Sequence, residues 1–190
     1  MTISVTHDRF KLAQVFTISR GSRSEINVLT VRVTRGGITG WGECVPYARY
    51  GETLENVTAL IAELPDGIGR ATLQDVMPAG AARNAVDCAL WDLEAKQTGR
   101  RVWQLAGLSA PGPELTAYTL SLDTPEKMRA EAAKHAHRPL LKIKLGTADD
   151  MQNHYYFFIL VNINLFFIIF PQENSIYLFI DSQTHQSWLQ

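Results

Sequence analysis

The amino-acid sequence predicts an α+β fold, in which an antiparallel sheet with its helices is followed by a β-α-β unit. Three observations lead to this prediction. Residues 2–19 are typical of an extended segment and 25–35 of a strand, and Gly36–Gly37 is typical of a hairpin turn. Residues 81–98 carry apolar side chains at helical spacing. Residues 115–146 then repeat the order strand, helix, strand.

The N-terminal strands are separated by a polar segment. Residues 2–19 are expected to be extended, and Glu25–Arg35 to form a strand with Ile26, Val28, Thr30 and Arg32 on one face. The segment 19–24 between them contains Arg20 and Arg23 and is expected to be a flexible loop. It is either a solvated turn or a lid that clamps a carboxylate, for which the planar guanidinium is suited.

After the hairpin turn the chain is expected to return through Ile38 to Cys44. The glycines, proline and aromatic residues of 40–52 are dense enough to predict a shaped loop there rather than a strand.

Three helices are expected next. Thr53 is suited to cap a helix over 54–64 with Leu54, Val57, Ile61 and Leu64 on one face, and Thr72 to cap a short helix that ends before Pro78. The third helix covers 81–98 and ends at Gly99. Its alanine-rich stripe predicts close packing against another element; the stripe consists of Ala82, Ala85, Val86, Ala89, Leu90 and Leu93.

Two acidic residues of the third helix, Asp87 and Asp92, are five positions apart and fall on different faces. They are therefore interpreted as solvated or locally bonded, not as a metal pair. A short helix is expected over Val102–Ala106, and Pro111–Gly112–Pro113 is the predicted linker between domains.

The β-α-β unit consists of strands over 115–122 and 140–146 and a helix over 125–137, which implies parallel strands. In the second strand Leu141, Ile143 and Leu145 face one way, and Lys142 and Lys144 face the other. Parallel sheets are usually covered on both faces. Burial and repulsion between two neighbouring ammonium groups both lower the pKa of a lysine. The resulting neutral amine can remove a proton from carbon. The alternative is that the lysines lie on the wet face of an ordinary sheet.

The net charge, the cysteines and the N-terminal residues limit the partners and the location that are expected for the protein. The 190 residues include 18 Lys and Arg and 19 Asp and Glu, so the net charge of −1 argues against nucleic acid or an acidic membrane as partner. The two cysteines, Cys44 and Cys88, have neither metal-ligand spacing nor a disulfide pattern, and the N-terminus has no secretory pattern. A cytoplasmic location is expected.

The last 38 residues, 153–190, differ in composition from the rest, because they contain no Ala, Lys or Arg and hold six of the 8 phenylalanines. We interpret them as a foreign tail. Residues 155–170 are nearly all apolar, which leaves a membrane anchor as an alternative. As a helix, however, this run would span about 24 Å, less than the roughly 30 Å hydrocarbon core.

Several motifs together resemble the enolase superfamily over residues 1 to about 152. They are Gly40–Glu43, Arg49–Glu52, the helical segment 78–93 and Lys142–Ile143–Lys144. Within the superfamily the muconate-lactonizing subgroup, and in it the L-Ala-D/L-Glu dipeptide epimerases, fit best. The resemblance implies a capping domain over 1–110 and the truncated start of a (β/α) barrel over 114–152, with the unrelated tail after it.

The resemblance also implies roles for individual residues. Lys144 matches the base that removes the substrate α-proton, with Lys142 as its neighbour near the carboxylate. Arg23 matches the arginine that holds the distal carboxylate of the substrate, and Tyr50 lies in a second specificity loop. The complete enzyme is implied to use Mg²⁺ and a small dipeptide, and a homo-oligomer is left open for it.

The chain also departs from the family pattern. After Asp150 the only acidic residues are Glu173 and Asp181, and no lysine follows Lys144, so three carboxylate ligands and a second base cannot be assigned. A (β/α) barrel takes about 250 residues. We therefore expect this chain to bind no Mg²⁺ and to be inactive, with unpaired strand edges. The alternatives are part of a muconate cycloisomerase or o-succinylbenzoate synthase, or a small non-enzymatic or membrane-anchored protein.

Overall fold

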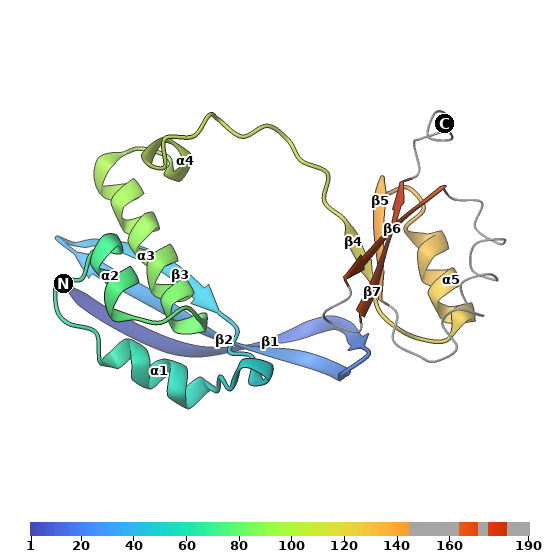
Figure 1. Cartoon of the computed structure of the whole chain (residues 1–190), viewed down its shortest axis with the longest axis horizontal. Coiled ribbons are helices and arrows are strands. Elements are labelled where there is room, and N and C mark those ends of the chain that lie inside the picture. The colour runs from blue at the N-terminus through green and yellow to red at the C-terminus, as the bar shows by residue number, and fades with distance from the viewer. Residues whose placement is uncertain (145–163, 171–174, 182–190) are drawn as a thin grey trace. The chain divides into compact units, whose positions relative to one another are not determined.

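A computed structural model describes residues 1–144 and the backbone of 164–170 and 175–181. The chain divides into two compact units, one of Met1–Lys11 with Glu25–Gly112 and one of Leu12–Ser24 with Pro113–Gln190. Figure 1 shows the elements in chain order. They are β1 (Thr2–Ile18), β2 (Gly21–Arg35), β3 (Ile38–Cys44), the 3-10 helix η1 (Ala48–Tyr50), α1 (Leu54–Ala62), α2 (Arg70–Val76), α3 (Ala81–Thr98), α4 (Val102–Leu105), β4 (Tyr118–Leu120), α5 (Pro125–Lys134), β5 (Leu140–Lys144), β6 (Asn164–Phe170) and β7 (Ser175–Asp181).

The first sheet has the strand order β1-β2-β3. β2 and β3 are antiparallel, with Leu29 opposite Cys44 and Arg35 opposite Ile38. Gly36 and Gly37 join them with φ of 57° and 77°, the backbone that a two-residue hairpin turn needs. The predicted hairpin is therefore confirmed.

Two predictions about this sheet are wrong. The polar segment 19–24 is not a loop, because only Ser19 and Arg20 form the turn and β2 already begins at Gly21. Residues 40–44 are not a shaped loop either, since they complete β3. Glycine was interpreted as a sign of irregular backbone, whereas in β3 it makes room for a helix.

The helix that needs this room is α3. Its buried residues are those of the predicted alanine-rich stripe: Ala82, Ala85, Val86, Ala89, Leu90 and Leu93. A Cβ atom added to Gly42 would lie 2.1 Å from the Ala85 carbonyl oxygen, and one added to Gly40 would lie 2.1 Å from that of Ala89. The backbones of α3 and β3 are thus in direct contact, as the small residues on both elements permit.

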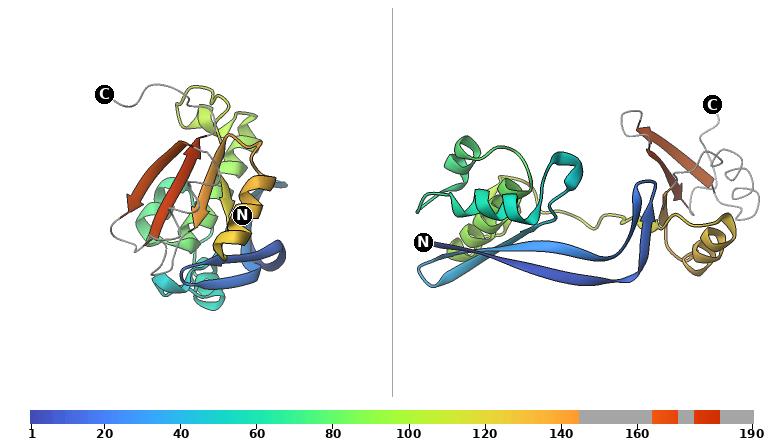
Figure 2. Two further views of the ribbon diagram at one scale, coloured as in Figure 1. Left: turned by 90° about the vertical axis from the view of Figure 1, so that its right-hand side faces the viewer. Right: turned by 90° about the horizontal axis from the view of Figure 1, so that it is seen from below.

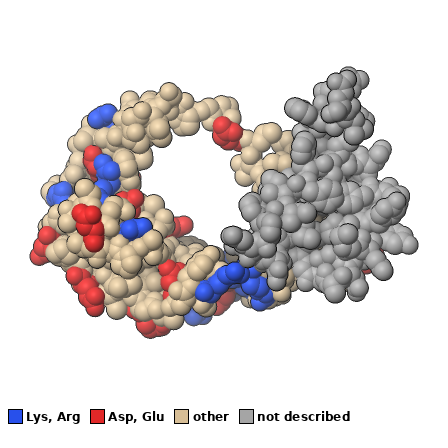
Figure 3. Space-filling view, viewed as in Figure 1, with Lys and Arg blue, Asp and Glu red and all other residues tan. Residues whose placement is uncertain are grey.

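The core of the first unit lies between the sheet and the helices, which Figure 2 shows on one face of the sheet. Leu29, Val31 and Val33 of β2 pack there with Val57 and Ile61 of α1. Thr53 caps α1 as predicted, in a reciprocal capping box with Asn56. The predicted cap at Thr72 is wrong, because α2 begins two residues earlier and has Gly69 as its N-cap. On the face shown in Figure 3, acidic and basic side chains are interspersed.

The second unit contains a sheet of order β4-β5-β7-β6. β4 and β5 are parallel, which confirms the β-α-β prediction, and the helix between them is α5. Leu120, Leu141 and Ile143 pack against Met128 and Ala132 of α5. β4 and α5 are shorter than expected, and the predicted end of β5 at 145–146 lies outside the described residues.

The other two strands of this sheet come from the C-terminal segment. β7 pairs antiparallel with β5, so the expectation that the β5 edge is unpaired is wrong. β6 pairs antiparallel with β7. Strands of a (β/α) barrel are all parallel, and β7 therefore does not continue the barrel pattern. Within the described residues, no helix is long and apolar enough to cross a membrane.

The contact between α3 and β3 predicts that Gly42→Ala lowers the free energy of unfolding by about 3 kcal/mol, since backbone must move to admit the methyl group. Gly112→Ala is the matched control, because its Cβ would meet no atom within 4 Å. Urea unfolding of both variants measures the difference. Equal stability of the two variants would contradict the close approach.

Candidate functional site

The lysine pair lies on the β5 face that is opposite α5. Leu141 and Ile143 are 3% and 1% exposed on the α5 side, while Lys142 and Lys144 alternate with them and are half-buried. The predicted division of the strand into an apolar and a lysine face is confirmed. Both ammonium groups thus lie on the same side of the sheet, two residues apart.

Lys144 lies at the carboxyl end of β5. The register pairs Thr119 with Lys142 and Leu120 with Ile143, where β4 ends; Ser121 is the first residue after β4, and Lys144 is the last residue of β5. Neighbouring strands are about 4.8 Å apart. In parallel sheets with crossover helices, ligands bind beyond the carboxyl ends of the strands. Lys144 and Ser121 therefore lie at the end of the sheet where chemistry is expected.

Arg23 lies on β2, within the hairpin arm, by which we mean residues 12–24 at the far end of the β1–β2 hairpin. The arm belongs to the same compact unit as Lys142 and Lys144, and the Arg23 side chain is exposed. Across the hairpin, Thr17 Oγ1 and Ser22 Oγ are hydrogen-bonded at 2.9 Å. Tyr50, in contrast, belongs to the other unit.

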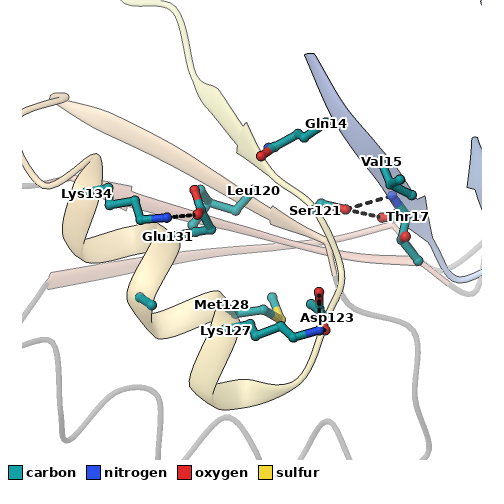
Figure 4. Close-up of a pocket in the computed structure, with 11 residues that line it drawn as sticks. Gln14, Val15, Thr17, Leu120, Ser121, Asp123, Lys127, Met128, Glu131 and Lys134 are labelled. Atoms are coloured by element: carbon teal, nitrogen blue, oxygen red, sulfur yellow. Dashed lines mark hydrogen bonds and ion pairs between the residues drawn. The ribbon is translucent and has the colours of Figure 1, made fainter. Parts of the chain in front are cut away.

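A cavity of about 380 Å³ lies beside the arm (Figure 4). Its apolar lining includes Leu120 and Met128, and its four charged groups form two ion pairs, Lys127 with Asp123 and Lys134 with Glu131. The lining residues are Gln14, Val15, Thr17, Leu120, Ser121, Asp123, Lys127, Met128, Ala130, Glu131 and Lys134. The cavity thus lies between the arm, β4 and α5, and its charged side chains are paired with one another.

The loop that carries Tyr50 is organised by Glu52. One carboxylate oxygen of Glu52 accepts a hydrogen bond from the Tyr47 amide at 3.0 Å, and the other accepts one from the Ala81 amide at 2.6 Å. Ala81 is the first residue of α3, so the carboxylate also lies at the positive end of the helix dipole. Tyr50 packs edge-on against Tyr47 and is 70% exposed. Its ring is available on a loop that α3 holds in place.

Cys44 is an unsuitable nucleophile. It is buried at the end of β3, and burial, followed by the charges of Glu52 and Glu43, raises the pKa of its thiol to about 11. A nucleophilic cysteine needs its thiolate near neutral pH. Cys88 is exposed, and burial of its sulfur followed by the nearby Asp87 also raises its thiol pKa. Neither thiol is therefore suited to act as a nucleophile near neutral pH.

The described residues do not offer a magnesium site. Among them, no group of three His, Cys, Asp or Glu side chains could hold a metal ion. Asp87 and Asp92 are locally bonded as expected, to Gln74 and to the Trp41 amide with Lys96.

Asp181, which ends β7, does not contribute to a site with Lys144. The register places it beside Leu140, at the other end of β5. Four residues of strand, about 13 Å, separate that position from Lys144.

Two residues, one in each unit, make structural contacts that were not identified from the sequence. Glu52 was noted only within the Arg49–Glu52 motif. Nothing in the local sequence indicates that its carboxylate caps a helix that begins 29 residues later. Ser121 was not noted at all, because its partner Thr17 is 104 residues away in the sequence. The only available signal for Ser121 was its position directly after a predicted strand of a β-α-β unit.

The N-terminal part of the chain is similar to a known family of domains. Residues 1–107 match the model of the mandelate racemase / muconate lactonizing enzyme N-terminal domain. The L-Ala-D/L-Glu epimerase of Escherichia coli (strain K12) is 41% identical over 150 residues, which are 76% of this chain and 47% of that protein.

Solved structures give the same result. An enolase family member from Agrobacterium tumefaciens with homology to dipeptide epimerases, with bound sodium and L-Ala-L-Glu, is 51% identical with a TM-score of 0.78. The match covers 83% of this chain and 49% of that one. The dipeptide epimerase from Enterococcus faecalis V583, complexed with Mg and L-Leu-L-Tyr, is 26% identical with a TM-score of 0.72, over 84% of this chain and 49% of that one. The chain thus spans about half the length of these relatives.

The position of Glu52 predicts that Glu52→Gln lowers the free energy of unfolding by about 1–2 kcal/mol, because an amide leaves one of the two backbone N–H groups without its acceptor. Glu63→Gln is the matched control, since Glu63 is exposed and has no side-chain hydrogen bond among the described residues. Thermal unfolding followed by circular dichroism compares the two variants. A loss that is no larger for Glu52→Gln than for Glu63→Gln would contradict the capping role.

Proposed function

The chain belongs to the mandelate racemase / muconate lactonizing enzyme family, and from this premise we propose that residues 1–144 supply the capping domain and the first catalytic strand of a dipeptide epimerase. The substrate we propose is an L-Ala-D/L-Glu dipeptide. The observation that carries the proposal is the lysine pair, which lies half-buried on one face of β5 with Lys144 at the carboxyl end of the strand.

Lys144 acts as the base in this proposal. Its neutral Nζ takes the proton from the α-carbon of the second residue of the dipeptide, and the electron pair left on carbon moves into the adjacent carboxylate. Return of a proton to the opposite face of that carbon inverts the configuration. The group that returns it lies outside residues 1–144 in this proposal, so Lys144 serves one stereochemical direction.

Lys142 holds the reacting carboxylate, which gains charge as the proton leaves. An ammonium group on the same strand face is placed to stabilise that charge electrostatically. Arg23 on the hairpin arm pairs with the distal carboxylate of the glutamate side chain, and its planar fork suits a bidentate contact. Tyr50 is proposed as a specificity residue on the second loop.

Relatives such as the Enterococcus faecalis enzyme are complexed with Mg in their solved structures. The described part of this chain does not provide the ligands, and no step above passes through the metal. Cys44 and Cys88 are both free thiols, and we propose a reducing, cytoplasmic location on that ground.

A cycloisomerase or o-succinylbenzoate synthase is the second candidate. Such an enzyme would share Lys142 and Lys144 but would not need Arg23. The two candidates therefore differ in whether a distal carboxylate on the substrate contributes to binding.

The proposed function is tested with a chimera that joins residues 1–144 to the remaining part of the Escherichia coli epimerase. In D₂O the chimera should exchange the glutamate α-proton of L-Ala-L-Glu for deuterium, followed by ¹H NMR. A folded chimera without exchange would contradict the proposal, and so would one that acts only on cycloisomerase substrates.

Lys144→Ala in the chimera is expected to abolish exchange from one epimer of the dipeptide, by a factor of about 10³ or more, while exchange from the other epimer continues. Lys142→Ala is the matched control on the same strand face and should slow exchange from both epimers. The two rates are measured separately, starting from L-Ala-L-Glu and from L-Ala-D-Glu. A one-sided loss in Lys142→Ala instead would reverse the assignment.

Arg23→Ala in the chimera is expected to raise KM for L-Ala-L-Glu about thirtyfold, because an ion pair with the distal carboxylate is lost. L-Ala-L-Ala, which has no distal carboxylate, is the control substrate, and its KM should stay unchanged. Steady-state kinetics with both dipeptides measure the effect. An equal change for the two substrates would show that Arg23 does not recognise the carboxylate.

A further inference from the structure

Ser121 links the hairpin arm to the carboxyl end of β4. Its hydroxyl oxygen accepts a hydrogen bond from the Thr17 amide at 2.7 Å and donates to the Thr17 carbonyl oxygen at 3.4 Å. The Leu122 amide donates to the same carbonyl oxygen at 3.0 Å. Figure 4 shows Ser121 reaching Thr17 with both contacts. The three hydrogen bonds all converge on one residue of the arm.

Thr17 is suited to this role because β1 is an edge strand of its sheet. The N–H and C=O of one strand residue point to the same side, so both groups of Thr17 are satisfied by Ser121 and Leu122 rather than by β2. On the other strand of the hairpin, Ser22 is joined to Thr17 through their hydroxyl groups, and Arg23 follows Ser22 directly. A continuous series of contacts thus leads from Ser121 to the residue before Arg23.

The same serine follows the end of β4, at the end of the sheet where β5 ends in Lys144. Leu120 pairs with Ile143, and the next residues along the chain are Ser121 and Lys144, respectively. The point where the arm is attached and the candidate base therefore lie at the same end of two adjacent strands. No other serine or threonine of the described residues combines a contact to the arm with this register.

We propose that Ser121 is a positioning residue, which anchors the hairpin arm beside Lys144 and so fixes where Arg23 meets the substrate. The effect on substrate rests on the proposed function, whereas the anchoring does not. Ser121 acts through Thr17 and contacts no reacting atom. Ser121 is half-buried. It holds the hairpin in one geometry although the two-residue turn at its end is exposed.

Hydrogen exchange of the full 190-residue chain tests the anchoring. In Ser121→Ala the Thr17 amide loses its acceptor and should exchange about fivefold to tenfold faster, together with its neighbours in the arm. Amides of α3 should keep their wild-type rates, since they belong to the other unit. Ser121→Thr retains the hydroxyl group and should restore the slow exchange at Thr17.

Ser24→Ala is the matched control, because Ser24 lies in the same arm and its side chain has no hydrogen bond among the described residues. Wild-type exchange at Thr17 in Ser121→Ala would overturn the anchoring role. A general acceleration that includes α3, or no recovery in Ser121→Thr, would also overturn it, because the serine would then serve stability alone.

The chimera tests the consequence for substrate. Ser121→Ala should raise KM for L-Ala-L-Glu about tenfold with kcat within about twofold, and should leave KM for L-Ala-L-Ala unchanged. Equal effects on both dipeptides would overturn the link to Arg23. If the unsubstituted chimera is inactive while exchange at Thr17 behaves as stated, the proposed function fails and the anchoring by Ser121 stands.

Discussion

The close approach of α3 to β3 is the constraint on which the first unit depends. Two glycines in β3 and a stripe of alanines in α3 bring backbone against backbone, where an added methyl group at Gly40 or Gly42 would lie 2.1 Å from a helix carbonyl oxygen. Packing of this kind fixes the helix to one position along the strand, because no flexible side chain lies between them to absorb a shift. Since α1 and α2 pack on α3 in turn, the whole helical layer takes its place from this contact.

The position of α3 also determines the loop before α1. Glu52 reaches the first amide of α3, so the helix N-terminus and the Tyr47–Gly51 loop hold each other. A helix whose N-cap is Gly80 has no side-chain cap of its own, and the carboxylate supplies the missing acceptor. The specificity loop proposed for Tyr50 is thus attached to the same helix that orders the core.

In the second unit, a single strand combines packing and chemistry. The buried side of β5 joins α5, and the same alternation turns both lysines to the other side. Because β4 runs parallel to β5, Ser121, which follows β4, and Lys144, which ends β5, lie at the same end of the sheet, and Ser121 holds the hairpin arm. The lysines and the arm are brought into one unit by two short strands and three hydrogen bonds.

The sequence by itself determined the features that depend on local periodicity. The buried face of α3, the Gly36–Gly37 turn, the Thr53 cap and the two faces of β5 were all predicted from residues fewer than about twenty positions apart. The family was predicted from several such local motifs, spread over residues 40–144. Glycine at 40 and 42 was misinterpreted as a loop signal, since the helix that requires it lies more than 40 residues later. The roles of Glu52 and Ser121, the antiparallel β7 beside β5 and the shortness of the turn at Ser19–Arg20 were decided only by the tertiary structure. Glu52, Ser121 and the edge of β5 each meet a partner that is distant in the sequence, and local pattern carries no information about which distant backbone group a carboxylate, hydroxyl or strand edge will meet.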